Sequence, residues 1–221
     1  LIKLVDGILF SEESNVTLDG RLISNFTRKE LAQKIAYLHQ ESKFTFSFTV
    51  RDVVMMGRFP YLRGVLTYSA EDISVVKEMM NLMEINDFSE RNFNELSGGE
   101  KQRICIARAL AANPEVIICD EVTSALDQLV AEGILELLQN LQNKLQVSYL
   151  FITHDLATVK AISDEIVVML QGRIVEQGVK KEILTPPHHE YTELLLSSVP
   201  EMDPDWLDNL LEERRENLEK V

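Results

Sequence analysis

The sequence has few cysteines, a deficit of basic side chains and no long apolar run. Among its 221 residues only Cys105 and Cys119 are cysteines, and 22 Lys and Arg stand against 36 Asp and Glu, for a net charge of −14. Two cysteines inside apolar segments indicate thiols that fill core space in a reducing compartment, and not a disulfide framework or a metal cluster. The acidic balance argues against nucleic acid or anionic lipid as a partner. No apolar run reaches the roughly 18 residues that a membrane-spanning helix needs.

The amino-acid composition is that of a globular protein. Hydrophobic residues make up 45% of the chain and charged residues 26%, and both values are ordinary. A chain of this length can bury the core of one sizeable α/β domain and a smaller subdomain. Composition therefore sets the broad class, and the function has to be sought in short motifs.

The first motif is Ser97-Gly98-Gly99-Glu100, which has the spacing of a capping box. Such a box starts a helix, and the free N–H groups at a helix N-terminus beside two glycines can approach a phosphate closely. An isolated S-x-x-E is more often a helix cap and nothing more, but the motifs downstream favour the phosphate-binding interpretation. We expect the helix from Glu100 to end near Asn113, because Pro114 disfavours helical backbone in the residue before it.

The second motif is the run Val116–Cys119 followed by Asp120 and Glu121. A run that is apolar at every position is expected for a parallel strand buried on both faces. In open α/β sheets, ligands bind beyond the carboxyl ends of such strands. Adjacent strand residues point to opposite sides, so the two carboxylates can take different roles. Alone they would be read as solvated surface groups, but their place between two other motifs favours a functional interpretation.

Other patterns predict the remaining elements. Apolar residues at helical spacing predict a helix over 70–83, and a further helix is expected from Asp127 to about Leu145. We expect Phe59–Leu62 to be a loop and Val147–Ile152 to be a strand that its apolar content buries. A Gln171-Gly172 turn is expected to join two strands.

Three linked motifs carry a resemblance to a known family: LSGGE at 96–100, VIICDE at 116–121 and SALD at 124–127. In this order they resemble the signature motif, the Walker B motif and the D-loop of ABC-type ATPases. The resemblance implies an α/β fold, a P-loop NTPase-type parallel sheet flanked by helices, with an inserted ABC helical subdomain. It also implies ATP and Mg²⁺ as ligands. The family usually has proline after the glutamate, and Val122 in its place is expected to change the stiffness of the loop more than the chemistry.

The resemblance also implies a role for each matching residue. Asp120 would hold Mg²⁺ through water, Glu121 would polarise the attacking water, and His154 would contact the γ-phosphate. Gln40 resembles the glutamine that reaches Mg²⁺ and senses a transporter partner, although a lone glutamine after a strand is equally well a surface loop residue. The nucleotide-binding residues implied are Gln40, Ser97, Gly98, Gly99, Glu100 and Asp127. In the family, the signature residues complete the site of a second ATPase domain.

The resemblance divides the chain into three parts. Residues 1–40 and 96–198 would form a RecA-like ATPase core, 41–95 the helical subdomain, and 199–221 an acidic C-terminal tail. No phosphate-binding loop of the form G-x-x-x-x-G-K-S/T occurs in the sequence. Because Leu1–Ile8 resembles the helix that follows this loop in the family, we expect the chain to be N-terminally truncated by the family's first strands.

Residues 44–62 are unusually rich in large apolar side chains: Phe44, Phe46, Phe48, Met55, Met56, Phe59 and Tyr61. Packing in a core is one interpretation of these side chains. The other is a groove that receives a short helix from a membrane-embedded permease.

Different stretches resemble different branches of the family. From Asn113 onward the sequence resembles peptide and nickel importer ATPases, whereas residues 37–64 resemble those of haem, siderophore and cobalamin importers. The implied protein is a peripheral ATPase at the cytoplasmic face of the inner membrane. Its partners would be a second ABC ATPase domain, permease subunits and, indirectly, an extracytoplasmic substrate-binding protein, with no nucleic acid. A truncated, non-catalytic ABC domain remains the alternative from another class. A chromosome-type ABC ATPase is disfavoured because the 56 residues from Gln40 to the signature leave no room for its long coiled coil, and a ribosome-associated one is disfavoured by the acidic charge.

We expect the printed 221-residue chain by itself not to hydrolyse ATP. The lysine and backbone amides of the phosphate-binding loop hold the β- and γ-phosphates in such enzymes, and these residues are not in the sequence. Phosphate release from the purified chain with Mg-ATP measures this. Turnover of about 1 per second that Glu121→Gln abolishes would contradict the expectation.

Overall fold

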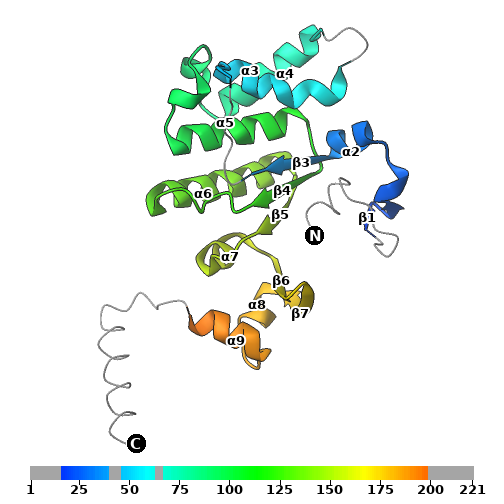
Figure 1. Ribbon diagram of the computed structural model, residues 1–221, viewed down its shortest axis with the longest axis vertical. Helices are drawn as coiled ribbons and strands as arrows, with labels where there is room; N and C mark the ends of the chain where they lie inside the picture. Colours follow the sequence, from blue (N-terminus) through cyan, green and yellow to red (C-terminus); the bar gives the residue numbers. More distant parts are fainter. Residues whose placement is uncertain (1–15, 40–45, 63–66, 199–221) are drawn as a thin grey trace, which may run out of the picture. The chain divides into compact units, whose positions relative to one another are not determined.

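The computed structural model describes residues 16–39, 46–62 and 67–198 (Figure 1). The helix expected at Leu1–Ile8, the proposed roles of Gln40 and Phe44, and the tail 199–221 therefore lie outside the described residues. The chain forms two compact units, Leu1–His154 and Asp155–Val221. The expected boundaries of core, helical subdomain and tail remain predictions.

The first unit is built on a three-stranded parallel sheet in the order β3-β4-β5. Strand β3 is Ile35–Leu38, β4 is Val116–Asp120 and β5 is Ser148–Ile152. The register pairs Tyr37 with Ile118, and Asp120 with Ile152. Three residues of the central strand have no exposed surface: Ile117, Ile118 and Cys119. The predicted buried parallel strand is thus confirmed, and burial raises the pKa of the Cys119 thiol.

Strand β5 differs from its prediction. The strand forms where expected, but Ser148 is exposed, Leu150 is 37% exposed, and the other three residues are only half-buried. In the part of the chain that the structure describes, β5 pairs with β4 alone. The prediction of a buried strand was wrong because an apolar run shows that a strand can be covered, but not whether it has a neighbour on both sides.

Helices and a short hairpin make up the rest of the first unit. A short hairpin, β1 (Thr17–Leu18) and β2 (Arg21–Leu22), turns at Asp19 and Gly20, both at positive φ. The helices of the first unit are η1 Ile23–Asn25, α2 Arg28–Lys34, α3 Val50–Met55, η2 Met56–Tyr61, α4 Ala70–Leu82, η3 Asn86–Phe88, η4 Phe93–Glu95, α5 Gly98–Ala111 and α6 Gln128–Leu145. Figure 1 shows α3 and α4 gathered beside α5, and α5 in turn contacts β3 and α6.

Local sequence decides where these helices begin. Capping boxes start α2, α3, α4 and α5, at Thr27, Thr49, Ser69 and Ser97. Each box satisfies backbone N–H groups that have no partner within the helix. At the other end of α5 the chain leaves the helix at Ala112, and Asn113 takes a positive φ before Pro114. The predicted helix is therefore confirmed to within two residues.

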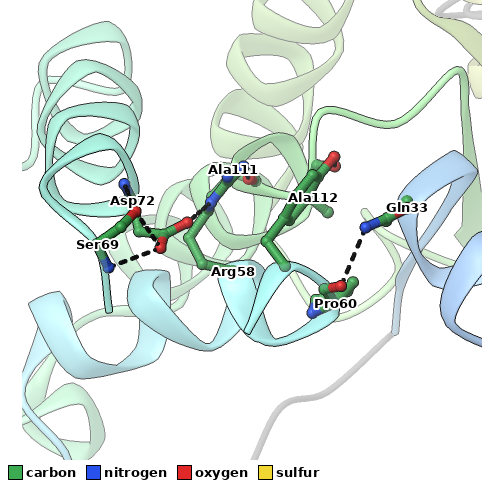
Figure 2. A network of polar contacts seen from close by, with 8 residues as sticks. Gln33, Arg58, Pro60, Ser69, Asp72, Ala111 and Ala112 are labelled. Carbon is green, nitrogen blue, oxygen red and sulfur yellow. Dashed lines mark hydrogen bonds and ion pairs between the residues drawn. The ribbon is translucent and has the colours of Figure 1, made fainter. Parts of the chain in front are cut away.

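The segment Phe59–Leu62 is not a loop for most of its length, because η2 continues to Tyr61 with Pro60 inside it. Tertiary hydrogen bonds hold this 3-10 helix (Figure 2). The Arg58 guanidinium donates from Nε to Asp72 Oδ1 at 2.7 Å and from Nη1 to the Ala111 carbonyl at 2.8 Å. From α2, Gln33 Nε2 donates to the Pro60 carbonyl at 3.0 Å.

Two further contacts complete this junction. The Tyr61 hydroxyl donates to the Ala112 carbonyl at 2.8 Å, and the Arg58 guanidinium lies 3.8 Å from the centroid of the Tyr61 ring. A side chain at Gly57 would collide with the backbone of Arg108, so only glycine lets η2 approach α5 this closely. Helix η2 therefore joins α2, α4 and the C-terminal end of α5.

The second unit contains α7 Leu156–Ile162, β6 Glu165–Leu170, β7 Arg173–Val179, α8 Lys180–Ile183 and α9 Glu190–Ser197. Strands β6 and β7 form an antiparallel hairpin with a bulge at Val168 and Met169. Its turn is Gln171-Gly172, both at positive φ, as predicted. No helix among the described residues is long and apolar enough to span a membrane.

The buried Arg58–Asp72 pair generates a prediction. The Ser69 hydroxyl, together with Arg58, lowers the pKa of Asp72 from 3.8 to about 2. We expect Asp72→Asn to lower the free energy of unfolding by about 3 kcal/mol at pH 7, because it leaves the Arg58 charge buried without its partner. Urea unfolding monitored by circular dichroism measures this.

The dependence on pH has a definite sign. The carboxylate of Asp72 stabilises the fold above its unfolded pKa, and this contribution is lost as pH falls from about 4 towards 2. The difference between wild type and Asp72→Asn should therefore shrink over that range. Glu71→Gln, at the exposed neighbouring position, is the matched control. An equal effect of the two substitutions would contradict the assignment.

Candidate functional site

Asp120 is the last residue of β4, and it is half-buried. Its Oδ2 atom accepts a hydrogen bond from the Tyr37 hydroxyl at 2.7 Å. Tyr37 reaches it from β3, where it pairs with Ile118, two residues before Asp120. This hydrogen bond to one of its two oxygens orients the Asp120 carboxylate.

Glu121 follows the strand in a left-handed backbone conformation, with φ of 50°. Its N–H donates to the Ile152 carbonyl at 2.9 Å, which extends the pairing of β4 with β5 by one residue. Its Oε1 atom lies 2.8 Å from His154 Nδ1. The carboxylate is 30% exposed and the imidazole 78%. The two residues predicted to be catalytic therefore meet at solvent, from the carboxyl ends of neighbouring strands.

Ser97 caps α5, and its partner is Glu100. The Ser97 hydroxyl and N–H donate to Glu100 Oε2 at 2.6 and 2.8 Å, and the Ser97 hydroxyl oxygen accepts from the Glu100 N–H at 3.4 Å. The hydroxyl, and then the backbone N–H, hold the pKa of Glu100 below its ordinary value of 4.5. The Glu100 carboxylate is thus engaged in the cap, while Gly98 and Gly99 form the first turn of the helix.

Asp127 caps α6. Its Oδ1 atom accepts from the Val130 N–H at 3.1 Å, so the carboxylate satisfies the start of the helix that follows. The first glycines of α5 lie against the same region: a Cβ at Gly98 would stand 3.2 Å from Leu126 Cδ2, and one at Gly99 would stand 2.9 Å from Val130 Cγ1. The signature and D-loop segments are therefore in close contact within one chain.

The structure brings some of the predicted residues together and keeps others apart. Asp120, Glu121 and His154 share the edge formed by the strand ends. Within the described ranges, no hydrogen bond or ion pair joins Ser97–Glu100 to this group. Gln40 lies outside the described residues, so its predicted role stays a prediction.

Sequence reasoning missed Tyr37 and Ser124. Tyr37 donates to Asp120, and the Ser124 hydroxyl donates to the Glu121 carbonyl at 2.9 Å. The signal for Tyr37 was its place in the short apolar run Ile35–Leu38, which is typical of a strand. Nothing in the sequence fixed which strands were neighbours, so this pairing needed the sheet order.

The group at the strand ends fits a magnesium ion better than a metal that needs many protein ligands. Mg²⁺ prefers oxygen, keeps several waters and takes one or two carboxylates together with substrate phosphates. Asp120 offers such a carboxylate, oriented by Tyr37. In the part of the chain that is described, no group of three or more His, Cys, Asp or Glu could hold a metal alone.

Two family matches cover most of the chain. Residues 1–124 match the family described as ABC transporter, and residues 175–221 match the family described as oligopeptide/dipeptide transporter, C-terminal region. The first match contains the Ser97–Glu100 motif, Asp120 and Glu121. The second begins within β7.

Proteins with similar sequences are named as ATP-binding proteins of transport systems. The chain is 40% identical over 196 residues to the oligopeptide transport ATP-binding protein OppF of Streptococcus mutans, with 88% of this chain and 62% of that protein covered. It is 35% identical over 210 residues to the dipeptide transport ATP-binding protein DppF of Lactococcus lactis, with 92% and 66% covered. The chain thus spans less than two thirds of the length of these relatives.

Solved structures agree in fold. The chain resembles cbiO1 from Clostridium perfringens, part of an ABC transporter complex, with a TM-score of 0.74, 25% identity and coverage of 96% of this chain and 81% of that one. It also resembles a metal-chelate type ABC transporter in an inward-facing conformation, with a TM-score of 0.66, 30% identity and coverage of 69% and 61%. The predicted P-loop NTPase-type α/β fold is confirmed.

The cap at Ser97 generates a prediction about stability. We expect Ser97→Ala to lower the free energy of unfolding by about 1 kcal/mol, because the first turn of α5 loses its side-chain acceptor. A melting temperature lower by about 2–4 °C would report this loss. Ser97→Thr, which keeps a hydroxyl that can cap the helix and donate to Glu100, is the matched control and should melt near wild type.

The pH dependence of this loss follows from the lowered pKa of Glu100. The paired carboxylate stabilises the fold above its unfolded pKa, so the contribution disappears as pH falls through the lower, folded pKa. The difference between Ser97→Ala and wild type should therefore narrow in acid. A constant or widening difference would count against the capping-box explanation.

Proposed function

The chain belongs to the ABC transporter family, and we propose that it supplies the ATP-binding and ATP-hydrolysing domain of a peptide importer. The observation that carries the proposal is the convergence of Asp120, Glu121 and His154 at the carboxyl ends of β4 and β5. Carboxylates and an imidazole at this edge of a parallel sheet suit phosphoryl transfer to water, which needs charge stabilisation and an aligned nucleophile.

Each of these side chains has a distinct task in the proposed reaction. A bound Mg²⁺ would neutralise charge on the phosphates, and Asp120, held by Tyr37, would be its carboxylate ligand through water. Glu121 would take the proton of the attacking water, and its exposed carboxylate edge is open to such a water. His154 orients Glu121 through their 2.8 Å contact and would reach the γ-phosphate.

The signature segment supports a dimer in which each chain completes the other's site. The glycines at the start of α5 offer backbone N–H groups to an anion, yet Ser97–Glu100 make no hydrogen bond or ion pair with the strand-end group in the described part of the chain. We therefore propose that Ser97, Gly98 and Gly99 act on nucleotide bound by a second ABC ATPase domain.

Peptides are the proposed cargo. The names of the Streptococcus mutans and Lactococcus lactis relatives support this, and so does the match of residues 175–221 to the C-terminal region of oligopeptide and dipeptide transporters. The alternative is an importer of metal chelates such as haem or siderophores. It is supported by the 30% identity to the metal-chelate type transporter.

A permease is the proposed membrane partner, which would place the chain at the cytoplasmic face of the membrane. Phe46 is 72% exposed and Phe59 is 55% exposed, while Met55 and Met56 are half-buried. The core interpretation therefore does not account for the two phenylalanines, and a docked helix would cover them. This surface lies in the predicted helical subdomain, 41–95.

The role of Glu121 can be tested in a chain extended before Leu1 by the N-terminal segment of a peptide-import ATPase, from its first strands to the end of its G-x-x-x-x-G-K-S/T loop. We expect Glu121→Gln to lower ATP turnover by about 10²-fold or more, because the amide keeps its shape but cannot accept the proton. ATP binding should persist, and a dimer should accumulate in gel filtration with Mg-ATP.

Glu136→Gln, at an exposed position on α6, is the control and should turn over ATP like the parent chain. Near-normal turnover of Glu121→Gln would show that Glu121 is not the base. A parent chain that neither binds nor hydrolyses ATP would sink the proposed function itself.

A further inference from the structure

The first two residues of α5, Gly98 and Gly99, pack against Leu126 and Val130 so closely that a side chain on either glycine would be crowded. A Cβ at Gly99 would stand 2.9 Å from Val130 Cγ1, closer than real Cβ atoms approach another heavy atom. A Cβ at Gly98 would stand 3.2 Å from Leu126 Cδ2, which is also tighter than ordinary contact. Leu126 and Val130 therefore form a seat for the two glycines.

This seat is fixed relative to Glu121 by hydrogen bonds. The Ser124 hydroxyl and N–H both donate to the Glu121 carbonyl, at 2.9 and 3.1 Å. The Leu126 N–H donates to the Thr123 carbonyl at 3.1 Å. Asp127 then accepts from the Val130 N–H at 3.1 Å as α6 begins. Hydrogen bonds therefore hold the backbone from Glu121 to Leu126, and a separate bond fixes the start of α6 at Asp127 and Val130.

The seat cannot yield easily at Val130. A valine in a helix has one strongly preferred rotamer, because its branched Cβ crowds the preceding turn. The Val130 methyl group therefore has no ready alternative position when an atom is added at Gly99. Leu126 has more rotamers available, and a Cβ at Gly98 would approach it less closely, at 3.2 Å.

We propose that Leu126 and Val130 are positioning residues that lock the signature glycines to the chain's own Glu121. The lack of side chains at Gly98 and Gly99 then serves contact within the chain as well as any approach to phosphate. The effect of this contact on ATP hydrolysis rests on the proposed function. If Ser97, Gly98 and Gly99 act on nucleotide bound by a second domain, the seat connects that nucleotide site with the site that contains the chain's own Glu121.

The first test uses the 221-residue chain without nucleotide. We expect Gly99→Ala to lower the melting temperature by about 3 °C or more, although alanine normally favours a helix over glycine. Amide hydrogen exchange at Ser124 and Leu126 should accelerate by about tenfold or more, since their hydrogen bonds belong to the locally opened unit. Amides of α4 should exchange as in wild type.

Two variants make this test specific. The double variant Gly99→Ala/Val130→Ala removes the colliding methyl group and should restore both the melting temperature and the slow exchange of Ser124 and Leu126. Gly133→Ala lies on α6, where a Cβ would meet nothing within 4 Å, so it should melt at or above wild type. A Gly99→Ala chain that behaves like Gly133→Ala, or a double variant with additive losses, would overturn the seat.

The second test measures the effect on ATP hydrolysis in the extended, ATP-hydrolysing chain. Val130→Ala leaves both glycines untouched and loosens the seat, so kcat should fall by about three- to tenfold while the KM for ATP stays near that of the parent. An unchanged kcat, with exchange altered as above, would show that the seat does not link the sites. Absence of turnover in the parent chain refutes the proposed function instead, and the first test then decides the seat alone.

Discussion

The candidate site depends on the parallel pairing of β4 with β3 on one side and β5 on the other. Strands that run the same way end at the same edge, so the residues that follow them converge there. Tyr37 reaches Asp120 from β3, and His154 reaches Glu121 from just beyond β5. An antiparallel strand in either place would carry these side chains to the opposite edge of the sheet and leave two unsupported carboxylates.

Helix α5 depends on contacts at both of its ends. Its C-terminal carbonyls at Ala111 and Ala112 accept from Arg58 and Tyr61 of η2, and its first turn packs on the segment after Glu121. The same η2 helix is bonded to α2, which runs directly into β3. Helix α5, which begins with Gly98 and Gly99, is thereby connected to β3, which carries Tyr37, and to the segment that follows β4, which carries Asp120.

The backbone of Glu121 adopts an unfavourable conformation, with φ of 50°. A left-handed conformation in a residue other than glycine costs on the order of 1–3 kcal/mol and persists only where its surroundings enforce it. Here the surroundings are the Ile152 carbonyl on one side and the Ser124 hydroxyl on the other. In this conformation the Glu121 carboxylate lies 2.8 Å from His154 Nδ1. The strain is thus part of what places the proposed base.

The sequence by itself determined the features that depend on neighbours a few residues apart. The cap at Ser97, the end of α5 before Pro114, the strand at 116–119 and the Gln171-Gly172 turn are all local, so capping and periodicity predicted them. Only the tertiary structure decided the Tyr37–Asp120 bond, the exposed edge of β5, the 3-10 helix where a loop was expected, and the seat of Gly99 on Val130. Each of these joins segments that are distant in sequence, and their contact follows from the order of strands and the packing of helices, which no short stretch of residues specifies.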